Sequence, residues 1–303
     1  MLVTGASGFL GQPLVERLAT MGYRITALGM RQKDSPFSPK VEYAAGDLAD
    51  ADSTYALLNP WRWDAIINLA GPMSKNQATW DEDCQTLSQH VNIVLNVCLA
   101  IPQTWMGRLV HVSSMVVYGI PERLPVDESH PRRPVNAYGA AKVLAEDALF
   151  AVARKNHLDC WALRLPGLFC ETRQSGALSR FMRAAAEGHP LLVSAPQPTP
   201  WDVLHLADAI EGIVRALMTE ERNPGAVNLG YGSPVELVTM AEQIAARAGT
   251  RVRVDNIDGV RHPTFQMDIR KARSLLNWPP TTLQERLESM WEALKYKQRS
   301  EVS

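Results

Sequence analysis

The sequence contains a phenol and an amine spaced to act together on one face of a helix. Tyr138 and Lys142 are four residues apart, and side chains at that spacing are neighbours on a helix surface. A free tyrosine loses its proton only near pH ~10, so it needs a nearby positive charge to act as a base at neutral pH. Lys142 supplies such a charge. The pair therefore predicts proton transfer to or from an alcohol.

A serine completes this set. Ser114 comes two residues after the apolar run 109–112, which has the length of a strand. The C-terminal ends of strands in α/β sheets border the crevice in which ligands bind. We therefore expect Ser114 to hold a substrate oxygen, and Ser114, Tyr138 and Lys142 are the predicted catalytic residues.

A glycine-rich turn near the N-terminus predicts a dinucleotide site. Gly5, Gly8 and Gly11 are spaced three apart between an expected strand at 2–4 and an expected helix at 10–21. Glycines let the backbone turn sharply and approach a pyrophosphate, and the helix N-terminus offers free N–H groups. The predicted cofactor contacts in this turn are Gly5, Ser7, Gly8, Phe9, Leu10 and Gly11.

The end of the second strand bears on the choice of cofactor. A carboxylate normally binds the ribose of NAD there, but the expected strand 24–28 runs into Gly29, and Arg31 and Lys33 follow. A missing acid beside an arginine favours NADP(H), with NAD as the alternative if the two basic residues belong to a solvated loop. Asp47, with Leu48, follows the third strand and is expected to reach the adenine edge.

Alternating strands and helices predict an α/β fold, a Rossmann doubly wound parallel sheet with a smaller mixed α/β C-terminal substrate domain. The cofactor domain is expected over 1–165, with a segment near 201–219 returning to it, and the substrate domain over 166–303. The expected strands are 2–4, 24–28, 41–45, 65–69, 109–112 and 160–165, and the expected helices are 10–21, 53–58, Trp80–Ala100, 138–156, Leu206–Met218, 234–248 and 283–297.

Taken in order, the motifs resemble those of the extended short-chain dehydrogenase/reductase (SDR) superfamily, specifically the NAD-dependent epimerase/dehydratase family. The similarity covers residues 1 to about 290. Its motifs are the turn 4–11, Asp47 with Leu48, the segment 68–71, Asn92, Ser114, Tyr138 with Lys142, and the segments 164–169, 202–208, 228–230 and 268–272.

The resemblance implies further contacts and an assembly. For the cofactor it adds Leu69, Ala70, Gly71, Asn92 and Leu165, together with Tyr138 and Lys142 on the nicotinamide side. It also implies a homodimer formed through the helices 80–100 and 138–156. The predicted substrate-binding residues are Ser114, Met73, Val116, Gly167, Arg180, Trp201 and Arg261.

Departures from the family's patterns narrow the reaction. Met115 and Val116 stand where the dehydratases carry an Asp-Glu pair, which disfavours dehydration. Val116 also replaces the cysteine of the double epimerases, and no histidine lies between His157 and His189. The reactions that remain are those that need only the transfer of a hydride and of one proton. The missing strand-end acid favours an NADP-linked reductase of a 4-keto sugar over an NAD-dependent 4-epimerase, and a non-catalytic NADP(H)-binding regulator is the alternative of another class.

The substrate is expected to be a nucleotide sugar. Gly167 replaces an asparagine that usually contacts substrate, and Trp201 stands where an arginine is common, so a smaller or more apolar carbonyl compound stays open. Arg261 is the expected clamp for a diphosphate, because guanidinium binds phosphate through two hydrogen bonds. Arg180 is a further candidate.

Composition excludes several other classes. Lys and Arg total 31 against 32 for Asp and Glu, so the net charge of −1 gives no basic field for nucleic acid. Four cysteines without regular spacing indicate free thiols rather than a disulfide scaffold, and no cluster of histidines predicts a metal site. No apolar run reaches the ~18 residues of a membrane span, and a signal peptide is not apparent. We expect a cytoplasmic protein.

Overall fold

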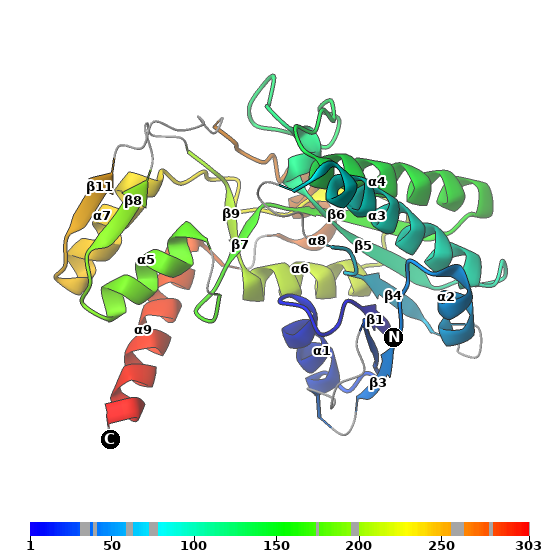
Figure 1. The fold of residues 1–303 in the computed structure, drawn as a ribbon, viewed down its shortest axis with the longest axis horizontal. Coiled ribbons are helices and arrows are strands. Elements are labelled where there is room, and N and C mark those ends of the chain that lie inside the picture. The colour runs from blue at the N-terminus through cyan, green and yellow to red at the C-terminus, as the bar shows by residue number, and fades with distance from the viewer. Residues whose placement is uncertain are drawn as a thin grey trace. The chain divides into compact units, whose positions relative to one another are not determined.

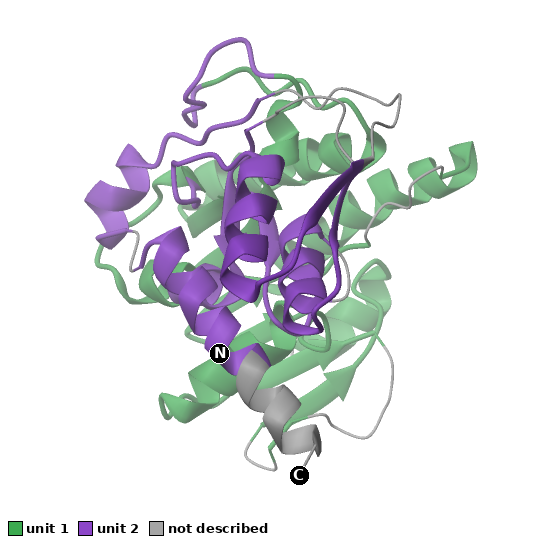
Figure 2. Ribbon diagram, turned by 90° about the vertical axis from the view of Figure 1, so that its left-hand side faces the viewer, with its two compact units in different colours: residues 1–120, 130–164, 212–227 green, residues 121–129, 165–211, 228–303 purple. Residues whose placement is uncertain are grey.

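The computed structural model describes residues 1–30, 37–38, 41–58, 63–72, 78–173, 176–194, 200–255, 264–278 and 281–302. The chain divides into two compact units, which Figure 2 draws in green and purple. Unit 1 comprises 1–120, 130–164 and 212–227, and unit 2 comprises 121–129, 165–211 and 228–303. The chain therefore leaves unit 1 at 121 and again at 165, and it returns through 212–227, whereas the sequence predicted a returning segment near 201–219.

A seven-stranded parallel sheet forms the centre of unit 1, as expected for a doubly wound fold. Its strands are β1 (Leu2–Thr4), β2 (Thr26–Gly29), β3 (Glu42–Ala45), β4 (Ala65–Asn68), β5 (Arg108–Ser114), β6 (Asp159–Leu165) and β10 (Gly225–Asn228). Their order is β10-β6-β5-β4-β1-β2-β3. Since β1 pairs with β2 on one side and with β4 on the other, the strand order reverses there, which opens a crevice at the C-terminal ends of these strands.

Helices connect these strands. They are α1 (Gly11–Thr20), α2 (Ala51–Leu58), α3 (Trp80–Ala100), α4 (Ala137–Asn156) and α6 (Leu206–Met218). A 3-10 turn, η1, lies at Met115–Tyr118. Thr79 and Glu82 form a capping box at the start of α3. The side chain of Asn136 caps α4 by accepting from the N–H of Gly139 at 2.8 Å. These caps fix where the two longest helices of unit 1 begin.

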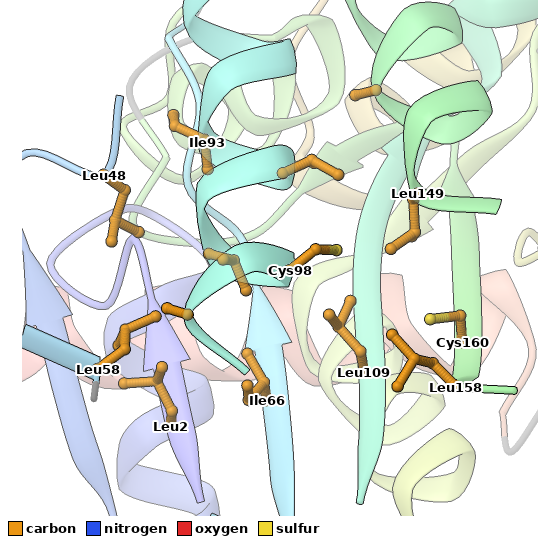
Figure 3. Packing of buried hydrophobic residues seen from close by; sticks show 14 of the residues in the cluster. Leu2, Leu48, Leu58, Ile66, Ile93, Cys98, Leu109, Leu149, Leu158 and Cys160 are labelled. Atoms are coloured by element: carbon orange, nitrogen blue, oxygen red, sulfur yellow. The ribbon is translucent and has the colours of Figure 1, made fainter. Parts of the chain in front are cut away.

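The main hydrophobic core lies between one face of this sheet and α2, α3 and α4 (Figure 3). Leu2, Ile66 and Leu109 project from neighbouring strands toward Ile93 of α3 and Leu149 of α4. Side chains alternate between the two faces of a strand, so every second residue of these strands contributes to this core. The core thereby holds α4 and its functional residues against β5.

The described residues of unit 2 form two small parallel sheets and four helices besides the start of α6. The strand β7 (Gly167–Phe169) pairs with β9 (Val203–His205), and β8 (Leu191–Ser194) pairs with β11 (Val252–Asp255). The helices are α5 (Ala177–Ala186), α7 (Leu237–Ala248), α8 (Arg270–Leu276) and α9 (Leu283–Val302), and Figure 1 shows α5, α7 and α9 near one another.

A buried carboxylate ties two helices of unit 2 together. Asp208, at the start of α6, is fully buried and accepts two hydrogen bonds from Arg286 of α9, at 2.6 and 2.8 Å. The Tyr231 hydroxyl donates a third, at 2.6 Å. A buried charge satisfied in this way is costly to leave unpaired, so Arg286 is a structural residue.

Within the described part of the chain, every helix is too short or too polar to span a bilayer. The described residues likewise include no group of three or more His, Cys, Asp or Glu side chains placed to hold a metal ion.

Two leucines on α4 provide a matched test of the core. Leu149 is fully buried and Leu144 is 47% exposed, so Leu149→Ala should lower the free energy of unfolding by about 2–5 kcal/mol and Leu144→Ala by less than about 0.5 kcal/mol. The measurement is urea unfolding of both variants. Equal losses would contradict the packing in Figure 3, and a loss at Leu144 that varies with protein concentration would place that residue in an interface.

Candidate active site

The glycine-rich turn packs closely against the end of β4. Gly5 adopts φ +64°, and a Cβ there would lie 2.9 Å from the backbone nitrogen of Ala70. At Gly11 a Cβ would lie 2.3 Å from the carbonyl oxygen of Gly5. Both positions require glycine, because a side chain at either would displace backbone. The turn is therefore held at the crevice between β1 and β4, with the N-terminus of α1 following it.

A cavity of about 240 Å³ opens at this turn. Residues from the turn, from the ends of β2 and β3, from the segment after β4 and from α3 line it: Gly5, Ser7, Gly8, Leu28, Gly29, Met30, Gly46, Asp47, Leu48, Ala49, Leu69, Ala70, Gly71, Pro72, Gln89 and Ile93. Half of the cofactor residues predicted from the sequence thus meet at one cavity: Gly5, Ser7, Gly8, Asp47, Leu48, Leu69, Ala70 and Gly71. Small residues and free N–H groups at a strand-to-helix turn fit a dinucleotide.

Seven other predicted cofactor residues do not line this cavity: Gly11, Tyr138, Lys142, Leu165, Phe9, Leu10 and Asn92. Phe9 is 40% exposed and Leu10 precedes α1. Asn92 lies on the exposed face of α3, whereas Gln89 and Ile93 of the same helix line the cavity. Successive helical residues diverge by about 100°, so the structure brings Ile93, and not its neighbour Asn92, to the cavity.

The end of β2 carries no acidic side chain. Gly29 is its last residue, and the exposed Met30 follows. Arg31 and Lys33, on which the preference for NADP(H) depended, lie outside the described residues. Asp47 is exposed at the end of β3, where its carboxylate accepts from the N–H of Ala49 at 2.8 Å. Among the described residues, those at the end of β2, where NAD and NADP would be distinguished, are therefore uncharged.

A hydrogen-bonded series of side chains crosses the strand ends beneath the cavity. Thr4 of β1 donates to the Asn68 side chain of β4 at 2.7 Å, and the Asn68 amide donates to Nδ1 of His111 on β5 at 3.2 Å. All three residues are buried. Burial, with the nearby charge of Lys142, lowers the pKa of His111 well below its usual value, so the ring is neutral and accepts at Nδ1.

Tyr138 and Lys142 lie one turn apart on α4, as predicted. The Lys142 ammonium lies 5.8 Å from the centre of the Tyr138 ring and donates to the Val112 carbonyl of β5 at 2.9 Å. Burial lowers the pKa of Lys142 to about 8 and raises that of Tyr138 to about 12. Both shifts follow from desolvation of the charged form. The phenol therefore holds its proton until further positive charge arrives.

Ser114 is the last residue of β5, two positions after the carbonyl that binds Lys142. Its hydroxyl accepts from the N–H of Val116 at 3.4 Å. The next residues, Met115 and Val117, are buried apolar side chains. The predicted serine, tyrosine and lysine thus come from adjoining positions on β5 and α4, with apolar neighbours after the serine.

His90 is a site residue that the sequence analysis missed. Its ring lies edge-on to that of Tyr138, with centroids 5.7 Å apart, and its Nε2–H donates to the Pro72 carbonyl at 3.0 Å. A Cβ at Gly71 would lie 2.2 Å from the imidazole, so the ring fills the space between the cavity wall and the phenol. Burial, with the Lys142 charge, lowers the pKa of His90 to about 4, so it is neutral and packs rather than titrates.

A buried ion pair fixes α4 against the sheet. Glu146, one turn beyond Lys142, accepts from Arg164 of β6 at 2.6 and 3.0 Å and from the Ser113 hydroxyl at 2.5 Å. Arg164 also donates to the Tyr118 hydroxyl at 2.8 Å. Burial alone would lower the pKa of Arg164, but the bonds to Glu146 raise it.

The predicted substrate residues are only partly brought together. Gly167 and Trp201 line a second cavity, of about 250 Å³, within unit 2. Arg180 is exposed on α5 and does not line it. Met73 and Arg261 lie outside the described residues. Val116 belongs to η1 in unit 1. Leu165, which was predicted to contact the cofactor, is the buried last residue of β6.

The cavity in unit 2 is apolar. Its lining residues are Gly167, Leu168, Phe169, Gly176, Ala177, Leu178, Trp201, Val203 and Leu237. Trp201 packs against Phe265 with ring centroids 6.0 Å apart, and its indole nitrogen would be 3.8 Å from a Cβ at Gly167. Glycine at 167 therefore leaves the indole edge open toward this cavity.

Fold, glycine cradle and the Ser-Tyr-Lys set together define a dinucleotide-dependent oxidoreductase of the extended SDR type. The family model "NAD dependent epimerase/dehydratase family" matches residues 1–230, and the chain belongs to that family. The relatives that it matches are enzymes of this family, and the chain is an enzyme too.

Three relatives illustrate the range of activities. The chain is 29% identical to a UDP-glucose 4-epimerase of Mycolicibacterium smegmatis, over 92% of this chain and 93% of that protein. It is 28% identical to a dTDP-6-deoxy-L-talose 4-dehydrogenase (NAD(P)(+)) of Kitasatospora kifunensis, over 96% and 94%. Among solved structures it resembles MoeE5 in complex with UDP-glucose and NAD, with a TM-score of 0.80 and 25% identity over 99% of this chain and 98% of that one.

The lowered pKa of Lys142 predicts a pH dependence of stability. In the unfolded chain this lysine keeps its proton up to its ordinary value of 10.5, so between pH 8 and 10.5 the unfolded state binds more protons than the folded state, and stability rises with pH. Relative to Lys142→Met, the cofactor-free wild type should gain about 2 kcal/mol in free energy of unfolding from pH 8 to pH 10. The measurement is urea unfolding of both proteins. If their free energies of unfolding changed with pH in the same way, Lys142 would not be desolvated in the folded state.

Proposed function

We propose that this protein is an NAD-dependent 4-epimerase of a nucleotide-linked sugar. The observation that carries the proposal is the Tyr138, Lys142 and Ser114 set, with apolar Met115 and Val116 directly after the serine. The relatives are 4-epimerases and a 4-dehydrogenase, and neither activity needs a second acid or base there. We therefore place the 4-epimerase ahead of the 4-keto reductase that the sequence favoured.

The mechanism that we propose uses Tyr138 as the single proton carrier. When bound, NAD supplies the hydride acceptor and, in its oxidised form, a positive charge. With that charge and Lys142 both favouring tyrosinate, Tyr138 takes the proton of the C4 hydroxyl and later returns it to the same oxygen. Ser114 donates to this oxygen and holds it in place. An epimerase returns the hydrogen of C4 to the opposite face, whereas a dehydrogenase releases the ketone.

The residues that would hold the cofactor are those that line the cavity in unit 1. Backbone N–H groups of the turn that contains Gly5, Ser7 and Gly8 would bind the pyrophosphate, Asp47 and Leu48 the adenosine end, and Lys142 the nicotinamide ribose. The sequence favoured NADP(H), but NAD is bound in the relative solved with UDP-glucose, which supports NAD as the cofactor of the proposed reaction.

Unit 2 is proposed to select the substrate. Its apolar cavity at Gly167 and Trp201 has room for a ring to stack, which suits the base of a nucleotide. A homodimer through α3 and α4 is also proposed, because Trp80 and Leu99, large apolar side chains on α3, are 82% and 75% exposed.

Removing one oxygen tests the role of Tyr138. Tyr138→Phe should lower kcat by at least about 10²-fold, the lower range for loss of a general acid–base group, while NAD binding is retained because the phenol hydroxyl contributes to proton transfer. The measurement is turnover together with calorimetric binding of NAD. Tyr55→Phe, at a 56% exposed site on α2, is the matched control and should be unchanged. Full activity in Tyr138→Phe would refute the mechanism.

Product analysis separates the epimerase from the reductase. Incubated with UDP-glucose, the enzyme should produce the C4 epimer, observed by proton NMR, with no net change in absorbance at the wavelength of the reduced cofactor. The same experiment is run with other UDP-linked and dTDP-linked hexoses and pentoses. Stoichiometric consumption of NADPH with a 4-keto sugar nucleotide, and no epimer from any sugar, would instead establish the reductase.

A further inference from the structure

At the end of β2, where many dinucleotide-binding sheets place an acid to bind the adenosine ribose, this chain has Gly29, and the space beside it is filled from the next strand. A Cβ built on Gly29 would lie only 2.4 Å from the hydroxyl oxygen of Tyr43 and 3.0 Å from the hydroxyl oxygen of Ser7. Tyr43 belongs to β3, which pairs with β2 in parallel. The phenol thus occupies the position from which a strand-end acid would project.

Gly29 and Ser7 both line the cavity of unit 1. The Tyr43 hydroxyl therefore lies directly beside one of these lining residues, Gly29, although Tyr43 itself is not among the residues that line the cavity. Its ring is held by the buried Phe37, with ring centroids 6.0 Å apart. A phenol anchored at its ring and directed toward a cavity wall is suited to a fixed hydrogen bond.

We propose that Tyr43, with Ser7, binds the adenosine ribose in place of the missing acid, and that this neutral pair admits both NAD and NADP. The proposal rests on the proposed function only in taking a dinucleotide as the cofactor. Tyr43 is a specificity-determining residue in this view, and Gly29 is the glycine that makes room for it.

The hydrogen-bonding capacity of a carboxylate and that of a hydroxyl explain why a strand-end acid selects NAD whereas the Tyr43 and Ser7 pair would admit both cofactors. A carboxylate only accepts hydrogen bonds, so it binds the two hydroxyls of a ribose but repels a 2′-phosphate. A phenol or a serine hydroxyl both donates and accepts. Such a group can therefore accept from a 2′-hydroxyl or donate to a 2′-phosphate. Among the described residues that line this cavity, Asp47 alone is charged, and it follows the neighbouring strand β3.

The test is calorimetric binding of ADP-ribose and of 2′-phospho-ADP-ribose to the full-length protein after bound dinucleotide has been removed. The wild type should bind the two probes with dissociation constants within about tenfold of each other. Tyr43→Phe keeps the ring and removes the oxygen, and it should weaken ADP-ribose about three- to tenfold, the loss of one neutral hydrogen bond. Tyr23→Phe, at a partly buried tyrosine whose hydroxyl bonds to Met218, is the matched control and should bind both probes as the wild type does.

A pair of further variants separates recognition from a merely structural role. Gly29→Asp should weaken both probes in the wild-type background, since its Cβ would meet the Tyr43 hydroxyl. In the Tyr43→Ala background the same substitution has room, and it should restore ADP-ribose binding while rejecting 2′-phospho-ADP-ribose by at least about 100-fold. Thermal unfolding of each variant shows that it is folded.

Two outcomes would overturn the proposal. One is a wild type that discriminates between the probes by more than about 100-fold, and the other is a Tyr43→Phe variant that binds both probes unchanged. Because neither probe carries a nicotinamide or meets a sugar substrate, these results are independent of epimerisation. A protein that binds both probes as expected but converts no sugar would refute the proposed function and leave the role of Tyr43 intact.

Discussion

The buried ion pair between Glu146 and Arg164 is the constraint on which the geometry of the catalytic side chains depends. It joins α4 to β6, and through the Ser113 hydroxyl it also joins α4 to β5. Lys142 lies one turn before Glu146, and Ser114 directly follows Ser113. Breaking a buried pair of this kind by removing one partner costs about 3–5 kcal/mol, although Arg132, 3.3 Å from Glu146, stays as a second partner of that carboxylate. The positions of Lys142 and Ser114 therefore depend on Glu146 and Arg164, two residues that have no role in the proposed reaction.

The cofactor cavity depends on a different constraint, the reversal of strand order at β1. The strand β1 lies between β2 and β4, and a reversal of strand order of this kind leaves a crevice at the C-terminal ends of the strands. The glycines of the turn allow the backbone to lie against residues 69–71, and the bonds among Thr4, Asn68 and His111 hold the three strand ends in register. The cavity is thus a consequence of topology, kept open by small residues.

Long periodic segments could be predicted from the sequence and short ones could not. The helices Trp80–Ala100 and Leu206–Met218 have the expected bounds, because apolar residues recur along them at helical spacing. The strands β7 to β11 and the helix α8 were not anticipated, since each is short. The helix α5 was also missed, although its buried residues Leu178, Phe181, Met182 and Ala185 recur at helical spacing. Tyr138, Lys142 and Ser114 could be selected from local spacing alone. Tyr43, His90 and Glu146 could not, because each is brought to its partner from another strand or helix by tertiary packing.

An epimerase and a dehydrogenase would both use Tyr138 as the proposed single proton carrier, so the residues of unit 1 alone do not distinguish the two activities. His90 is neutral at physiological pH, since burial lowers its pKa to about 4, and the residues after Ser114 are apolar. In the proposed mechanism Tyr138 therefore both takes and returns the proton, which would restrict the reaction to reversible oxidation at a single carbon. Whether hydride returns to the same face depends on how the oxidised sugar is held, and the residues proposed to hold it belong to unit 2. There, Gly167 and Trp201 line an apolar cavity. In the proposed site, stacking and shape would therefore govern the binding of the base, and the sugar would have fewer fixed hydrogen bonds to restrain it.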